Sequence, residues 1–101
     1  MMNKDRLVIL NAPSSLEEAV VDCLLTLESE HGFSSFPVNV HHQENKGLSL
    51  AEQVSGRQKQ ICFQIHIDEG GAKLLLKRLQ EDFSGAGIQY WVVPILECSE
   101  V

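Results

Sequence analysis

The chain has few of the residues that would link it to nucleic acid or to a membrane. Lysine and arginine together number 8 against 14 aspartates and glutamates, which gives a formal net charge of -6. An acidic chain repels phosphate backbones and anionic lipid surfaces, so we expect no nucleic-acid partner. The first apolar run, Leu7–Leu10, is far shorter than a signal-peptide core or a membrane span. We therefore expect a cytoplasmic protein without membrane insertion.

Cysteine is also scarce. The chain has 3 cysteines, Cys23, Cys62 and Cys98, at wide spacing. An odd number at this spacing fits neither a disulfide framework nor a Cys-x-x-Cys metal knuckle, so we expect free thiols. The composition, 44% hydrophobic and 22% charged over 101 residues, is that of one small globular domain spanning residues 1–101.

The first part of the chain predicts a strand followed by a helix. Arg6–Asn11 is short, apolar and β-branched, which is typical of a buried strand. Ser14 and Glu17 have the spacing of a capping box, and apolar residues then recur at helical spacing. We expect this helix to end near His31.

The middle of the chain predicts an edge strand and a long loop. Phe33–His42 alternates apolar and polar residues, and Pro37 within it cannot donate a ladder hydrogen bond, which favours a sheet edge. Gln43–Gly56 is polar and bounded by glycines. We expect a connecting loop there, with a short helical turn at Ser49–Glu52.

The last part of the chain predicts a strand, a helix and a strand. Arg57–Ile67 predicts a strand, because Ile61, Phe63, Ile65 and Ile67 would lie on one face and Cys62, Gln64 and His66 on the other. Asp68 is placed to cap a helix whose apolar stripe runs to Phe83. Ile88–Leu96 is aromatic and β-branched, and its Pro94 again favours an edge.

This order, βαββαβ, predicts the ferredoxin-like α+β fold. Two right-handed β-α-β crossovers place both helices on one face of a four-stranded antiparallel sheet. The second and fourth strands would then form the two edges.

Two of the predicted strands are apolar on both sides, which predicts a contact surface. The first and fourth strands would be neighbours, so their second faces would join into one exposed apolar patch. Self-association would cover this patch. The residues concerned are Leu7, Val8, Ile9, Leu10, Tyr90, Trp91, Val92 and Val93.

Three segments resemble the signature segments of an uncharacterised bacterial family of PII-like proteins. They are Gly32–Phe36, Gly47–Arg57 and Gly85–Val92. The resemblance implies a ferredoxin-like homotrimer, related in shape to PII signalling proteins and to divalent-cation tolerance proteins. It also implies a gene often found beside heavy-metal efflux pumps of the resistance-nodulation-division type, and hence an efflux-system protein as a possible partner. It implies no established activity.

Histidine and cysteine suggest a metal site. His31, His41, His42, Cys62 and His66 could all ligate zinc or copper, and we take the last four as candidates. Adjacent His41 and His42 would project to opposite faces of a strand, and Cys62 and His66 would stand about 13 Å apart along one strand. Only contacts between chains, or with the loop, would bring such ligands together. The alternative is a set of solvated histidines at the end of an edge strand.

Arg57 and Lys59 form a basic pair at the mouth of the predicted loop and could hold a small anion or a nucleotide. The alternative is the charged start of a strand. No nucleophile lies near a base at a convincing spacing, so we expect a protein that is not an enzyme. The sequence indicates no particular cofactor. It favours a non-enzymatic PII-like binding or regulatory module whose working surface is the loop Gln43–Gly56.

Overall fold

The computed structural model describes residues 4–27, 31–41 and 57–101. The predicted loop Gln43–Gly56, its helical turn and His42 lie outside these residues.

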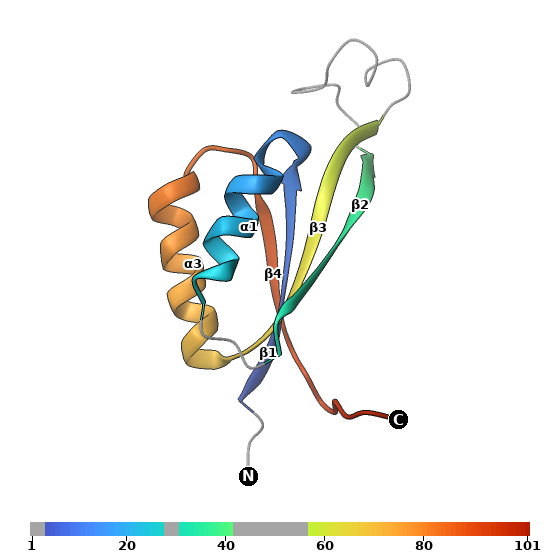
Figure 1. The fold of residues 1–101 in the computed structure, drawn as a ribbon, viewed down its shortest axis with the longest axis vertical. Helices are drawn as coiled ribbons and strands as arrows, with labels where there is room; N and C mark the ends of the chain where they lie inside the picture. The colour runs from blue at the N-terminus through green and yellow to red at the C-terminus, as the bar shows by residue number, and fades with distance from the viewer. Residues whose placement is uncertain (1–3, 28–30, 42–56) are drawn as a thin grey trace.

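Four strands form one antiparallel sheet in the order β2-β3-β1-β4, with two α-helices on one side of it (Figure 1). The predicted ferredoxin-like fold is therefore confirmed. The proline-bearing strands β2 and β4 are the two edges, as Pro37 and Pro94 predict. The strands are β1 (Asp5–Pro13), β2 (Phe33–His41), β3 (Arg57–Asp68) and β4 (Gln89–Pro94).

The first helix differs from its prediction at both ends. Ser14–Leu16 forms a short 3₁₀ turn, η1, and the α-helix α1 covers Glu17–Leu25. The predicted capping box is wrong, because Leu16 occupies the cap position and no side chain caps the helix. Extended backbone at Pro13 leads directly into the 3₁₀ turn, and Glu17 is the first helical residue instead of the third.

Helix α1 also ends before the predicted position near His31. The hydroxyl of Thr26 donates to the carbonyl of Cys23 at 2.6 Å. A hydroxyl that bonds backward in this way competes with continued helix formation. The apolar periodicity that runs on to Leu27 indicates packing against the core, rather than a longer helix.

The second helix, α3 (Glu69–Phe83), agrees with its prediction. The carboxylate of Asp68 accepts a hydrogen bond from the backbone N–H of Gly71 at 2.6 Å, which is the expected N-cap interaction. A Cβ atom at Gly71 would lie 2.5 Å from Cγ1 of Ile67. Glycine at this position therefore lets the first turn of α3 approach β3 closely.

The core lies between the sheet and the helices. Alternate residues of β1 and β3 point into it and meet apolar residues of both helices. Its largest fully buried side chains are Phe63, Leu10, Ile65, Leu75, Val8 and Val20. Among the described residues, no helix lies on the other side of the sheet (Figure 1).

Candidate functional site

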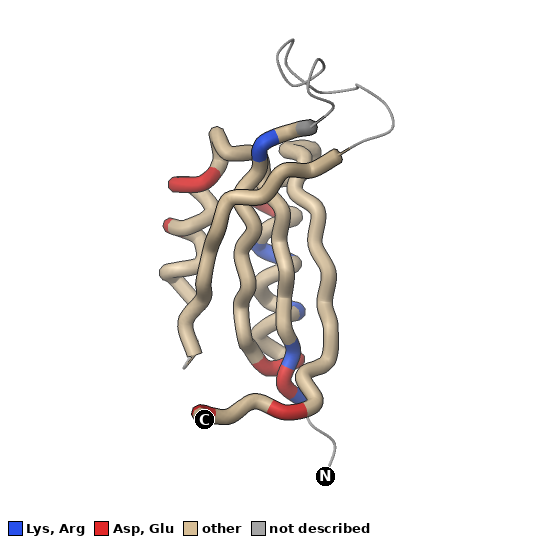
Figure 2. The backbone as a smooth tube through the Cα atoms, turned by 90° about the vertical axis from the view of Figure 1, so that its right-hand side faces the viewer, with Lys and Arg blue, Asp and Glu red and all other residues tan. Residues whose placement is uncertain are grey.

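The side of the sheet away from the helices, called the open face below, carries no formal charge through its middle. Figure 2 shows Lys, Arg, Asp and Glu on the strands at their ends, and residues 7–13, 33–41, 60–67 and 89–94 contain none. A sheet face that is solvated normally carries charged and polar residues. By register the open face includes Leu7, Ile9, Phe36, Val38, Cys62, Gln64, His66, Trp91 and Val93.

The predicted contact residues of β1 divide between the two faces. Leu7 and Ile9 lie on the open face, paired with Val93 and Trp91 of β4. Val8 and Leu10 are 0% exposed in the core, so the prediction that they contact another molecule is wrong. Because side chains alternate along a strand, the run Leu7–Leu10 divides evenly between core and surface.

Strand β4 is exposed on both of its faces. Trp91 and Val93, on the open face, are 44% and 37% exposed. Tyr90 and Val92, on the helix side, are 47% and 39% exposed, although their partners Leu10 and Val8 are buried. The helices therefore cover β1 and β3 and leave β4 largely uncovered.

Two of the thiols are protected within the sheet and the core. Burial raises the pKa of Cys62. Burial also raises the pKa of Cys23, an effect that Arg78 opposes and Asp82 reinforces. Cys98 is exposed. Since the thiolate is the form that ligates metals, Cys62 is a poor metal ligand within a subunit.

The predicted metal ligands lie far apart along the sheet. His41 is paired with Arg57 at one end of β3, and His66 is paired with Leu7 near the other end. Cys62 and His66 are separated by about 13 Å along the strand. Within the described ranges, no group of three or more His, Cys, Asp and Glu residues could hold a metal ion. The predicted anion-binding pair, Arg57 and Lys59, stands two residues apart on β3. The strand register places His41 of β2 opposite Arg57 and Asn39 opposite Lys59.

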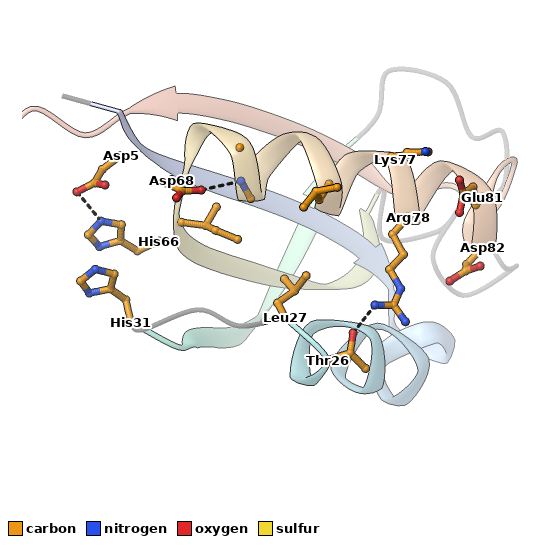
Figure 3. Close-up of a pocket in the computed structure, with 14 residues that line it drawn as sticks. Asp5, Thr26, Leu27, His31, His66, Asp68, Lys77, Arg78, Glu81 and Asp82 are labelled. Carbon is orange, nitrogen blue, oxygen red and sulfur yellow. Dashed lines mark hydrogen bonds and ion pairs between the residues drawn. The ribbon is translucent and has the colours of Figure 1, made fainter. Parts of the chain in front are cut away.

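The structure brings together a histidine pair that the sequence did not assign. The rings of His31 and His66 stack with their centroids 3.8 Å apart and an interplanar angle of 4°. Nε2 of His66 lies 3.3 Å from Oδ2 of Asp5. Figure 3 shows the three side chains at one end of a groove of about 1070 Å³ between the sheet and the helices. Stacked rings direct their nitrogen lone pairs in parallel planes, which does not suit one shared metal ion.

The rest of this groove is mixed in charge. Arg78 of α3 donates to the hydroxyl of Thr26 at 2.6 Å (Figure 3), which ties α3 to the end of α1. Lys77, Glu81 and Asp82 also line the groove. Such a lining selects neither an anion nor a cation.

A smaller groove of about 210 Å³ lies between α3 and β4. Leu76, Phe83, Ile88 and Tyr90 are among the residues that line it. No sequence pattern indicated this groove, because these residues match a helix stripe and a strand that would normally pack together. The groove exists because α3 does not reach across β4.

A comparison with protein families shows where the chain belongs. The model of a family of proteins of unknown function, DUF3240, matches residues 2–101. The chain belongs to the DUF3240 family. A comparison with curated protein sequences finds no match.

Solved structures share the fold over nearly the whole chain. A DUF3240 family protein from Shewanella baltica superposes with a TM-score of 0.79 at 23% identity, covering 99% of each chain. A putative PII-like signalling protein from Thermus thermophilus gives a TM-score of 0.67 at 22% identity, covering 93% of this chain and 91% of that one. CutA from Synechococcus elongatus gives 0.62 at 14% identity, covering 93% and 79%. The predicted PII-like fold is thus confirmed.

The helices of the described residues are too short or too polar to cross a membrane.

Proposed function

We propose that this DUF3240 protein is a non-enzymatic PII-like regulatory module that works in the cytoplasm as a homo-oligomer, specifically a homotrimer. One observation carries the proposal: the open face has apolar side chains on β1 and β4 and no formal charge through its middle, and no described helix lies over it. The structural likeness to a putative PII-like signalling protein supports it. A metal-efflux protein is the class of regulatory partner that the sequence resemblance suggests.

The size of the uncovered surface favours association. A fully buried large aromatic side chain covers about 200 Å². Trp91 on the open face is 44% exposed, so this side chain alone leaves roughly 90 Å² uncovered. Leu7, Ile9, Phe36, Val38 and Val93 extend the surface across the sheet. At about 25 cal/mol per Å² this gives several kcal/mol before association costs.

Light scattering coupled to gel filtration tests the proposal. We expect the mass of a trimer at micromolar concentration, well above the 11.3 kDa of one chain. A monomer would contradict the proposal. The mass of a dimer or a tetramer would support self-association but contradict the proposed trimer.

Binding of a small anion or a nucleotide is a second candidate, supported by the strand register. Positions 57 and 59 share one face of β3, and the positions opposite them on β2 hold His41 and Asn39. Cationic and amide donors at one sheet end suit phosphate oxygens. We expect ATP or phosphate to raise the melting temperature of the parent protein but not that of Arg57→Ala or Lys59→Ala. No shift in the parent protein would contradict this function.

Direct metal binding is a third candidate, and the structure limits how it would work. His66 lies beside Asp5 and His31 within one subunit, but His41 and Cys62 are distant, so a full ligand set needs donors from another subunit. Calorimetric titration with zinc, copper and nickel tests this. We expect binding that is lost in His66→Ala and His41→Ala; affinities weaker than about 100 μM, or about -5.5 kcal/mol, would contradict it.

A further inference from the structure

Uncharged polar side chains gather on the open face. By register, every carboxamide side chain of the four described strands lies on this face, except that of Asn39. Asn11 of β1 lies between Gln89 of β4 and Cys62 of β3, and glutamines precede and follow Cys62 along β3. We call the carboxamide residues of the open face the amide band: Asn11, Gln58, Gln60, Gln64 and Gln89.

The amide band lies between two apolar parts of the same face. Phe36 and Val38 of β2 lie on one side of the β3 glutamines, and the apolar residues of β1 and β4 lie on the other. Gln60 is only 7% exposed, and its amide nitrogen donates to Oε1 of Gln58 at 3.0 Å. A molecule that covers both apolar parts must therefore also cover the amides between them.

The chemistry of these amides indicates what covers them. A carboxamide carries no charge and offers both N–H donors and a carbonyl acceptor, so two copies of the same group can hydrogen-bond to each other. Charged residues of one sign cannot do so, because copies related by rotation bring like charges together. The exposed faces of the helices do carry charges, such as Glu18 and Asp22 on α1 and Lys73 and Lys77 on α3. An uncharged, self-complementary face fits a second copy of this chain.

Apolar and amide side chains contribute differently to such a contact. Burial of apolar area is non-directional, so it favours association without selecting one arrangement. A buried amide costs free energy unless it is hydrogen-bonded, and hydrogen bonds need defined distances and angles. For this reason a single buried asparagine can set the number of helices in a coiled coil. Arrangements in which amides meet amides are therefore favoured over all others.

We propose that the amide band of one copy hydrogen-bonds to the amide bands of neighbouring copies, and that these bonds determine the number of subunits. This inference rests on the proposed self-association and names the residues that restrict it to one stoichiometry. The apolar side chains supply the attraction, and the amides select the arrangement.

Replacing two of the amides by apolar side chains tests this role. Asn11→Leu and Gln64→Met nearly keep the size of each side chain and remove its hydrogen bonds. In the full chain carrying both substitutions, we expect native mass spectrometry to show a mixture of oligomers in place of the single species of the parent protein. Gln80→Met is the matched control, because Gln80 is exposed on α3, and it should keep the single species. A double variant that keeps the single species, or that is monomeric, would overturn the proposal.

A charge at one of the same positions gives an independent measurement. Gln64→Glu keeps the shape of the side chain but places a carboxylate in the band of every copy. We expect the dissociation constant of the oligomer to rise at least about tenfold, because a covered charge without a partner is unfavourable. Gln80→Glu should leave the dissociation constant unchanged. Equal constants for Gln64→Glu and the parent protein would place position 64 in water and overturn the proposal.

The mass of the parent protein separates this proposal from the proposed function. A trimeric parent protein whose assembly neither the double variant nor Gln64→Glu alters would overturn the role of the amides and leave the proposed function standing. A monomeric parent protein would overturn both. Melting temperatures within a few degrees of the parent show that each variant is folded.

Discussion

At the scale of single residues, the two buried thiols predict how the protein responds to alkali. Burial raises the pKa of Cys62 and of Cys23 above the ordinary thiol value of 9.0, which applies in the unfolded chain. The unfolded state therefore releases these protons first as the pH rises. Their contribution to stability is complete below that pH and is lost as the pH rises toward the folded pKa values. We expect the free energy of unfolding, measured by urea denaturation, to fall as the pH rises above the ordinary thiol pKa of 9.0.

The control for this prediction is the variant Cys23→Ala, Cys62→Ala, whose stability should fall less over the same range. An equal fall in both proteins would show that other groups are responsible. Alkylation gives an independent measurement: Cys98 should react in the native protein, and all 3 cysteines should react in denaturant.

The cap of α3 gives a second prediction at this scale. Asp68→Ala removes the acceptor for the backbone N–H of Gly71, so we expect a loss of about 1 kcal/mol in the free energy of unfolding. Asp68→Asn keeps an acceptor and should stay within about 0.5 kcal/mol of the parent protein. Equal losses in the two variants would contradict a capping role.

At the scale of elements, two adjacent glycines of α3 should behave in opposite ways. An alanine Cβ at Gly71 would lie 2.5 Å from Ile67, whereas one at Gly70 would meet nothing closer than 3.8 Å. We expect Gly71→Ala to destabilise the protein by about 1–3 kcal/mol through overpacking. Gly70→Ala should be neutral or stabilising by up to about 1 kcal/mol, since alanine favours helix. Thermal denaturation of both variants measures the difference, and equal effects would contradict close packing of α3 on β3.

Comparison of the elements shows which features a single sequence can specify. Strict alternation predicted β3 with its two faces, and the cap at Asp68 predicted the start of α3. The predicted start of α1 was wrong because of the conformation of Ser14. A capping box requires Ser14 at the N-cap position of the α-helix, whereas Ser14 follows extended backbone at Pro13 and begins a 3₁₀ turn. Alternation cannot show whether helices reach an edge strand, so the exposure of Tyr90 and Val92 was not predictable.

The candidate site shows the same limit. Sequence spacing placed Cys62 and His66 on one face but too far apart for one ion, and the structure agrees. The stacking of His31 on His66 joins residues distant in the chain, and it depends on how β2 begins beside the end of β3. No local pattern contains that information.

At the scale of the whole molecule, a charge on the open face should prevent assembly. Val93→Glu places a carboxylate beside Leu7, where covering it without a partner would cost several kcal/mol. We expect this variant to be monomeric by light scattering at concentrations where the parent protein is trimeric.

Leu74→Glu is the matched control. Leu74 is 67% exposed on α3, on the other side of the sheet, so its substitution should leave the oligomer unchanged. Dissociation by both substitutions would indicate general destabilisation instead of loss of a specific contact, and assembly of Val93→Glu would contradict the role of the open face.

The position of Trp91 has a practical consequence for such experiments. It is the 1 tryptophan of the chain, it is 44% exposed, and it lies on the open face beside Ile9. Indole emission moves to shorter wavelength when water is excluded from the ring. The intrinsic fluorescence of the unlabelled protein should therefore shift to the red on dilution as the subunits separate, so that each chain carries an optical probe on the β4 side of the open face.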